Sequence, residues 1–192
     1  MPYDTTYNTL QGNYFILRTV PPTTVSLNLD LVNDFESNDK RRTMWIAEKK
    51  DTKGNSYYYP YKYKQQTNTT STLEYSIIQR VEEQYLIRAE AYIEKGQTAL
   101  GLQDLNKIRT RSGILGINNL DKNYLLEALL KERRNEYFTE WGQRFYDLKH
   151  FGKLDDKMMM VKSNWKSYFK IFPIPEKELL INPNLAPQNE GY

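Results

Sequence analysis

Hydrophobic positions in the middle of the chain recur in steps of three and four residues, the spacing of one face of an α-helix. The first series predicts a helix over residues 76–96 that ends at Gly96, and the second predicts a helix that Thr98 caps and that ends near Gly113. Two helices joined by so short a turn form a helical hairpin. The apolar positions of the pair are Ile78, Val81, Tyr85, Ala89, Tyr92, Leu102, Leu105 and Ile108.

A third series predicts the longest helix, which starts at the capping residues 121–123. Its apolar side consists of Leu126, Leu130, Tyr137 and Trp141. Gly142 is expected to bend this element, because glycine tolerates backbone conformations that interrupt a helix, before the apolar face continues to Gly152. The predicted fold class is therefore mostly α.

The first part of the chain, residues 1–72, shows no sustained periodicity and is rich in Thr, Asn, Asp, Pro and Tyr. This composition predicts loops, short strands, a charged turn at 49–55 and one short helix near 29–35. The polar connector 65–72 is the expected boundary. We therefore expect a loop-rich segment 1–72 followed by a helical region 73–192, which together form one domain or part of one.

Prolines punctuate the last twenty residues, yet apolar side chains remain among them. Their presence favours a tail that packs against the rest of the protein instead of fraying. The expected apolar anchors are Ile171, Phe172, Ile174, Leu179 and Leu180.

Composition excludes several classes of protein. The 192 residues suffice for one domain, and they include no run of about 18 apolar residues such as a transmembrane helix needs. Residues 1–10 lack the basic start and apolar centre of an export signal, and the absence of cysteine excludes disulfides and thiolate metal sites. The net charge of +3 comes from charges spread along the whole chain, which argues against a nucleic-acid partner.

Glutamates in the third helix recur every four residues, at Glu132, Glu136 and Glu140. A di-iron site would also need Glu-x-x-His motifs, and the single histidine, His150, is not spaced in this way. The arginines that neutralise these acids are expected at Arg133, Arg134 and Arg144. The pattern predicts a structural network of ion pairs and no metal site.

Catalytic and cofactor motifs are absent from the sequence. His150 has no nucleophile motif near it and is expected at a helix end, where an imidazole favours the carbonyl end of the helix dipole. Met158–Met160 are expected to fill gaps in a core. No Gly-rich phosphate loop occurs, so neither an enzyme activity nor a cofactor is predicted.

Tyrosine is unusually frequent, with 16 residues, several of them in the loop-rich segment. Flat aromatic faces beside hydrogen-bond donors suit sugar rings, whose C–H faces pack on aromatic planes while their hydroxyls need polar partners. The alternative is a β-strand in which about half of these tyrosines are buried, and this alternative is preferred two to one on a rough estimate. The candidate ligand-binding residues are Arg42, Trp45, Tyr57, Tyr58 and Tyr59.

Several short motifs occur in a fixed order along the chain. They include Phe35-Glu36-x-Asn38-Asp39-x-Arg41, Tyr85-Leu86-Ile87-Arg88-Ala89-Glu90-Ala91, Glu132-Arg133-Arg134-x-Glu136, Gly142-x-Arg144-Phe145-Tyr146-Asp147-Leu148 and the ending Phe172-Pro173-Ile174-Pro175 to Tyr192. This set resembles the C-terminal part of the SusD/RagB family of outer-membrane nutrient-binding lipoproteins over residues 22–192. Lys40 and Glu190 depart from the family, which usually has proline at both positions. The helical hairpin also resembles a tetratricopeptide repeat unit.

The resemblance implies a non-enzymatic protein on the surface of a Bacteroidetes-type outer membrane, with a lipid anchor expected upstream of this chain. It also implies capture of a glycan such as starch, or of another nutrient, for a SusC-like TonB-dependent transporter. The competing hypothesis is a tetratricopeptide-type protein-interaction module without a small ligand. The side chains expected to hold the fold together are Arg133, Glu136, Arg144 and Asp147.

Overall fold

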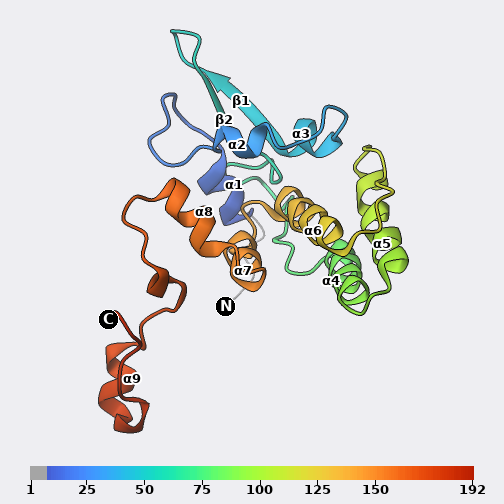
Figure 1. Cartoon of the computed structure of the whole chain (residues 1–192). Helices are drawn as coiled ribbons and strands as arrows, with labels where there is room; N and C mark the ends of the chain where they lie inside the picture. The colour runs from blue at the N-terminus through green and yellow to red at the C-terminus, as the bar shows by residue number, and fades with distance from the viewer. Residues whose placement is uncertain (1–7) are drawn as a thin grey trace. The chain divides into compact units, whose positions relative to one another are not determined.

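The structure is a computed structural model that describes residues 8–192 and contains two compact units, which meet in the sequence between Thr139 and Glu140 (Figure 1). Unit 1 comprises α1 (Leu10–Phe15), α2 (Leu29–Val32), α3 (Lys40–Trp45), β1 (Ile46–Lys50), β2 (Ser56–Pro60), α4 (Val81–Glu94), α5 (Thr98–Arg111) and α6 (Lys122–Tyr137). Unit 2 comprises α7 (Gln143–His150), α8 (Leu154–Val161), the 3-10 turn η1 (Ser167–Lys170), α9 (Glu176–Ile181) and the 3-10 turn η2 (Pro183–Leu185).

The predicted fold class, mostly α with a loop-rich first part, is confirmed. No helix within residues 8–192 is both long enough and apolar enough to cross a bilayer. The division at residue 72 stays a prediction, and the first seven residues of that segment lie outside the described part of the chain.

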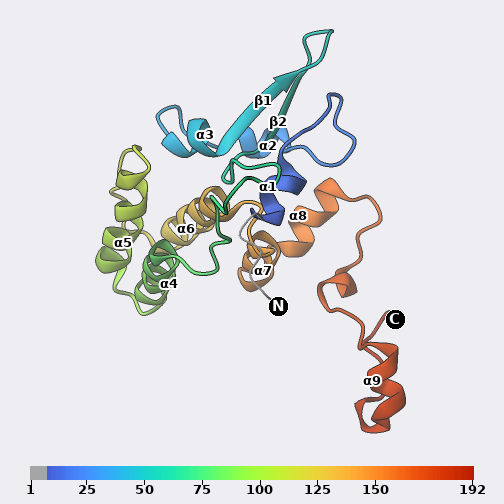
Figure 2. The same cartoon turned by 180° about the vertical axis from the view of Figure 1, so that it is seen from behind.

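Helices α4 and α5 form the predicted helical hairpin, and α6 packs against both of them (Figures 1 and 2). Gly96 has a φ of 77°, which lets the chain turn between α4 and α5. Gly101 lies so near α4 that a Cβ atom there would stand 2.5 Å from Cγ1 of Ile93 and 2.8 Å from the Ala89 carbonyl oxygen. The small residue therefore allows a close approach of the two helices. The buried apolar side chains of the three helices are Leu86, Ala89, Ile93, Leu105, Ile108, Leu125, Leu129 and Leu130.

The predicted start of the first helix is wrong, and its predicted apolar face is only partly confirmed, because Ala89 is buried and Tyr85 and Tyr92 are half-buried. The helix begins at Val81, because Arg80 is extended with φ −134° and ψ 149°. Ile78 and Val81 are 66% and 68% exposed, whereas Leu86 and Ile93 are fully buried. Both series have helical spacing, so periodicity alone did not determine which one faces the core. The likeness to a tetratricopeptide unit stays a prediction.

Helix α6 ends at Tyr137 and does not bend at Gly142 as predicted. Phe138 is extended, and Thr139, Trp141 and Gly142 have positive φ values of 62°, 44° and 72°. Three left-handed residues within four positions are incompatible with a continuing helix. Trp141 is 54% exposed, so it does not extend the apolar side of α6, and Gly142 instead immediately precedes α7.

Lys40, one of the two positions at which the sequence departs from the expected pattern, follows Asp39, the N-terminal cap of α3. The Asp39 carboxylate accepts a hydrogen bond from the Arg41 amide at 2.9 Å. The Lys40 amide donates to the Ser112 carbonyl at the end of α5, also at 2.9 Å. Proline is favourable at the first position of a helix but has no N–H to donate. The hydrogen bond of the Lys40 amide thus connects α3 to the end of α5.

Strands β1 and β2 form an antiparallel hairpin in which Lys49 pairs with Tyr57 and Ala47 with Tyr59. The Asp51 carboxylate organises the turn by accepting hydrogen bonds from the amides of Lys53 and Asn55 at 2.8 and 2.9 Å. The predicted charged turn and short strands are confirmed.

Both faces of this hairpin are covered by apolar side chains. One cluster consists of Ile16, Leu17 and Tyr59, with Val20, Ala47, Tyr57 and Tyr61 packed against it. The other cluster consists of Val32, Phe35, Ile46 and Phe138, with Leu27, Leu31, Trp45 and Tyr58 packed against it. The first cluster holds the loop that follows α1 beside the hairpin (Figures 1 and 2).

In unit 2, Asp155 of α8 organises the segment that follows its helix. Its carboxylate accepts hydrogen bonds from Trp165 Nε1 at 2.9 Å, Ser167 Oγ at 2.6 Å and Lys170 Nζ at 3.1 Å. These three donors lower the pKa of Asp155 from 3.8 to about 2.

The C-terminal tail is held mainly by polar contacts. Gln188 exchanges two hydrogen bonds with the Ile174 backbone, at 2.7 and 2.8 Å, and Asn189 Nδ2 donates to the Phe172 carbonyl at 2.8 Å. The ring of Phe172 lies 6.0 Å from that of Phe145 in α7, measured between centroids. The tail thus folds on itself and touches α7.

The predicted apolar anchors of the tail are only partly confirmed. Ile174 and Leu179 are half-buried, but Ile171, Phe172 and Leu180 are 47%, 64% and 75% exposed. Hydrogen bonds with the side chains of Gln188 and Asn189 hold the backbone at Ile174 and Phe172, where burial of apolar side chains was expected.

Two further expectations concern α7 and α8. His150 is the last residue of α7, as predicted. The expected packing of the methionines is wrong for Met159 and Met160, which are 58% and 76% exposed, while Met158 is half-buried.

Candidate functional site

The tyrosine strand β2 places its side chains on alternate faces of the hairpin, so its aromatic residues do not form one surface. Tyr59 is only 7% exposed, and its ring meets that of Tyr61 edge to face with centroids 5.9 Å apart. Burial raises the pKa of the Tyr59 hydroxyl. Tyr57, on the same face, is half-buried, and its hydroxyl donates to Asp51 Oδ2 at 3.3 Å. The predicted alternative of a partly buried strand therefore describes β2.

The other three predicted contact residues lie elsewhere. Arg42 and Trp45 belong to α3, and Tyr58 lies on the face of β2 opposite to Tyr57 and Tyr59. The Arg42 guanidinium stands 5.0 Å from the centre of the Tyr58 ring, and the Lys62 ammonium stands 4.7 Å from the Trp45 ring. Trp45 and Tyr58 are half-buried. Cations already cover these rings in the chain itself. A ligand-binding role of the five residues stays a prediction.

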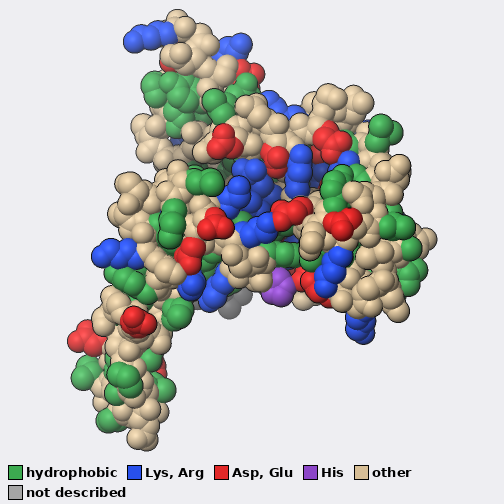
Figure 3. Space-filling model, in the orientation of Figure 1, with side chains coloured by type: hydrophobic (Ala, Val, Ile, Leu, Met, Phe, Trp, Pro, Cys, Tyr) green, Lys and Arg blue, Asp and Glu red, His purple; other side chains and the backbone are tan. Residues whose placement is uncertain are grey.

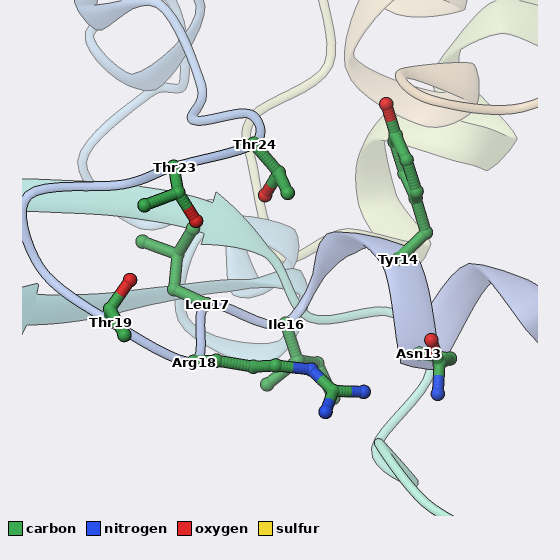
Figure 4. A pocket seen from close by; sticks show the side chains of 8 residues that line it. All are labelled: Asn13, Tyr14, Ile16, Leu17, Arg18, Thr19, Thr23 and Thr24. Atoms are coloured by element: carbon green, nitrogen blue, oxygen red, sulfur yellow. The ribbon is translucent and has the colours of Figure 1, made fainter.

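A hollow of about 220 Å³ lies beside the loop that follows α1, and we call it the loop hollow. Figure 4 shows Asn13 and Tyr14 of α1 on one side of it and the threonines of the loop on the other. Its lining consists of Asn13, Tyr14, Ile16, Leu17, Arg18, Thr19, Thr23 and Thr24. Hydroxyl, amide and guanidinium groups thus surround a small apolar floor, a combination that suits a polar ligand with hydrogen-bonding groups on its rim.

A second hollow of about 390 Å³ lies where the same loop meets the turn of the β-hairpin, and we call it the hairpin-turn hollow. Its lining consists of Val20, Pro21, Lys50, Asp51, Thr52, Lys53, Asn55 and Tyr57. Tyr57 is the only predicted contact residue that lines either hollow. The remaining lining residues were missed because they are scattered polar residues in segments without periodicity, and only the fold brings them together.

Glu136 on α6 is the centre of a buried group of charges that we call the arginine–carboxylate cluster. Its carboxylate is fully buried and lies 3.0 Å from Arg41, 2.8 Å from Arg80 and 2.7 Å from Arg111. Burial alone would raise the pKa of Glu136, but the hydrogen bond and charge of Arg111, with the charges of Arg80 and Arg41, outweigh burial and lower it. Glu136 is therefore held as an anion.

Glu132, one helical turn earlier, extends the cluster. Its carboxylate lies 2.6 Å from Arg41 and 3.4 Å from Arg109, and Arg41 also pairs with Asp39 at 2.7 Å. Burial raises the pKa of Glu132, and the charges of Arg41 and Arg109 offset this increase only in part. Figure 3 shows acidic and basic side chains intermixed over the region of α3 and α6.

Ion pairs neutralise Glu132 and Glu136 as predicted, and their partners include four arginines that were not predicted. Arg41 comes from α3, Arg109 and Arg111 come from α5, and Arg80 immediately precedes α4. Such partners, distant in sequence, leave no local pattern. Among residues 8–192, no group of three or more potential ligands is arranged to hold a metal ion.

The other side chains predicted to hold the fold together also lie in or near buried positions. Arg133 is 8% exposed, with its guanidinium 5.6 Å from the Tyr137 ring. On α7, Asp147 is 5% exposed and Arg144, three residues before it, is half-buried. Their structural role stays a prediction.

A sequence model of the SusD family matches residues 36–192. Starch-binding protein SusD from Bacteroides thetaiotaomicron is 32% identical over 123 residues, which cover 59% of this chain and 21% of that protein. SusD-like protein P25 from Formosa agariphila is 29% identical over 183 residues, which cover 85% of this chain and 34% of that protein. The chain thus spans only a minor part of the length of these two relatives.

Solved structures share the fold. A SusD superfamily protein from Bacteroides vulgatus superposes with a TM-score of 0.67 at 24% identity, over 87% of this chain and 44% of that one. Surface glycan-binding protein A from Bacteroides thetaiotaomicron gives a TM-score of 0.64 at 20% identity, over 86% of this chain and 41% of that one. At these identities the likeness establishes the architecture alone.

Proposed function

Because this chain belongs to the SusD family, we propose that it is part of a non-enzymatic protein that binds a glycan or another nutrient at the bacterial cell surface. The names of two similar proteins, a starch-binding protein and a surface glycan-binding protein, support this assignment. The family supports delivery of the ligand to a SusC-like TonB-dependent transporter. It also supports a place at the outer membrane, with a lipid anchor upstream of this chain.

The observation that carries the proposal is the loop hollow. Asn13, Thr19 and Thr23 offer amide and hydroxyl groups that match the hydroxyls of a sugar, and Tyr14 offers an aromatic face. The loop that bears them packs through Ile16 and Leu17 onto the hairpin. A rigid scaffold that presents polar loops is a common way to build a binding site.

The aromatic residues predicted from the sequence form a second, separate contact region in this proposal. Arg42, Trp45, Tyr57 and Tyr58 keep part of their surface accessible, whereas Tyr59 supports the hairpin from the buried side. A ligand would have to displace the cations that lie over Trp45 and Tyr58. The loop hollow requires no such displacement.

Isothermal titration of the chain with a panel of neutral and acidic oligosaccharides tests the proposal. The double variant Tyr14→Ala, Thr23→Ala should weaken binding at least about tenfold, the equivalent of about 1.4 kcal/mol. Tyr75→Ala removes a tyrosine that is 75% exposed outside both hollows and serves as the control. Trp45→Ala, Tyr58→Ala tests the second region. Failure of every glycan to bind would contradict the proposal, as would chain cleavage of a glycan during incubation.

The second candidate function is a protein-interaction module. It is favoured by apolar side chains exposed on and before α4, at Ile77, Ile78, Val81 and Ile87, of which the last two line a shallow hollow with Arg88. Exposed apolar groups of this kind mark protein contacts. A chain that binds no glycan but co-purifies with a transporter, and loses it on Ile78→Asp, Ile87→Asp substitution, would establish this function.

A further inference from the structure

The hairpin-turn hollow has more basic groups than its acidic groups can neutralise. The ammonium of Lys53 has no ion-pair partner within residues 8–192, and the Lys50 side chain is 63% exposed, with its ammonium 3.8 Å from Glu48. Glu48 also accepts a hydrogen bond from Ser56. Figure 3 shows Lys and Arg side chains projecting at the turn of the hairpin.

Asp51 is the single acidic residue of the lining, and its carboxylate is already used. Oδ1 accepts the amides of Lys53 and Asn55, at 2.8 and 2.9 Å, while Oδ2 accepts Asn55 Nδ2 at 2.8 Å and the Tyr57 hydroxyl at 3.3 Å. These contacts direct the carboxylate into the turn. The two lysines are therefore left to face solvent or a ligand.

The floor of the hollow suits a sugar ring. Tyr57 is half-buried against the cluster of Ile16, Leu17 and Tyr59, and Val20 belongs to the same packing. The hydroxyl contact with Asp51 holds the Tyr57 ring in place from its other end. A fixed aromatic ring beside donors is the combination that packs on the C–H face of a sugar.

Positive charge continues along the same loop into the loop hollow. Arg18 lines that hollow, which has no acidic residue in its lining. Lys49 donates a hydrogen bond to the Leu17 carbonyl between the two hollows. A ligand that follows the loop would thus meet Arg18, Lys50 and Lys53 in turn.

We propose that the hairpin-turn hollow binds the anionic group of an acidic oligosaccharide, a carboxylate or a sulfate ester, between Lys50 and Lys53, with the sugar ring on Tyr57. This inference rests on the proposed function and names the class of its ligand. Neutral sugar residues of the same oligosaccharide would lie toward the loop hollow.

Titration with three probes tests the inference: an oligogalacturonate, a sulfated galactan oligosaccharide and neutral maltoheptaose. The acidic probes should bind at least about tenfold more tightly than maltoheptaose at low salt, and their affinity should fall as sodium chloride is raised, because salt screens exposed charges. The relative affinity of the first two probes distinguishes a carboxylate from a sulfate.

The double variant Lys50→Gln, Lys53→Gln should lower the affinity for the acidic probe about tenfold and leave binding of maltoheptaose unchanged. Lys157→Gln, Lys177→Gln removes the same charge from exposed sites in unit 2 and should change neither affinity. The reversal Lys50→Glu, Lys53→Glu should abolish binding of the acidic probes, and circular dichroism confirms that each variant is folded.

Several results would overturn the inference. They are equal affinity for acidic and neutral probes, an equal loss in the Lys157 and Lys177 control, and equally tight binding of poly-glutamate, which would indicate attraction to any polyanion. Binding of maltoheptaose alone would overturn the inference while the proposed function stands. The absence of binding to every probe would overturn both.

Discussion

Within unit 1, charge is arranged in opposite ways in two regions. In the arginine–carboxylate cluster, Arg41, Arg80 and Arg111 each lie within 2.8 Å of at least one buried carboxylate oxygen. At the hairpin turn, Lys50 and Lys53 share a hollow whose single lining carboxylate is occupied by other donors. Matched charges removed from water can stabilise only each other, whereas exposed charges that are unpaired, or paired only at long distance as Lys50 is, remain available for a ligand.

Substitution of Glu136 should give the largest effect. Glu136→Gln leaves Arg41, Arg80 and Arg111 facing a neutral amide, and breaking a buried ion pair from one side costs about 3–5 kcal/mol. Urea denaturation monitored by circular dichroism measures the free energy of unfolding.

Two control substitutions provide the comparison for the loss of stability expected from Glu136→Gln. Glu94→Gln, which removes an exposed partner of Lys122, should cost less than about 0.5 kcal/mol. Lys50→Gln should leave stability unchanged. If Glu136→Gln were as mild as these two, the contrast between the two regions would disappear.

Arg144→Ala tests whether the buried carboxylate of Asp147 in unit 2 also depends on a neighbouring arginine. Asp147 is 5% exposed and lies one helical turn after Arg144, so loss of the guanidinium should lower the free energy of unfolding by about 1–3 kcal/mol. Differential scanning calorimetry measures the fall in Tm, and affinity per folded molecule should not change. Lys157→Ala is the control, and an unchanged Tm for Arg144→Ala would contradict the structural role.

Lys40→Pro tests whether a backbone hydrogen bond positions Arg41 in the arginine–carboxylate cluster. It removes the hydrogen bond from the Lys40 amide to the Ser112 carbonyl, which holds the segment bearing Arg41 beside the end of α5. We expect a loss of about 1–2 kcal/mol, although proline suits the first helical position. Lys40→Gln keeps the amide and should be neutral in the same urea titration; a proline variant of equal stability would show that the bond is dispensable.

Protonation of Asp155 in unit 2 should produce the smallest effect. The pKa of Asp155 is lowered to about 2 in the folded chain, below its ordinary value, so its contribution is complete above about pH 4 and is lost as the pH falls toward 2. The indole N–H resonance of Trp165, followed by NMR from about pH 5 to about pH 2, reports this loss. Asp155→Asn should remove the dependence; a resonance that still shifted in the variant would assign the transition to another group.

The helices of this chain could be predicted from sequence better than its candidate binding surfaces. The hairpin α4–α5 follows from local spacing, Gly96 and small residues. The face that α4 buries did not follow, because Val81 and Leu86 belong to two series of equal periodicity. Pairing with α6 decided between them, and that pairing is a property of the tertiary fold.

The candidate site was predicted least well for a related reason. Tyrosines gave a compositional signal, but Tyr59 supports the core, and of the five predicted contact residues only Tyr57 lines one of the two hollows. The residues that complete the hollows, such as Arg18 and Lys53, are single polar residues in irregular segments. No pattern in the sequence predicts that the loop after α1 lies beside the turn of the β-hairpin.

Gly101 gives the packing of α4 against α5 a narrow tolerance. The first side-chain carbon of any larger residue would come within 2.8 Å of the backbone oxygen of Ala89, and a backbone atom cannot move aside as a flexible side chain can. Among homologous chains, alanine at this position would therefore signal a wider interhelical gap, and with it a displaced set of arginines on α5. The residue at position 101 thus indicates whether a distant homologue has the same arginine–carboxylate cluster.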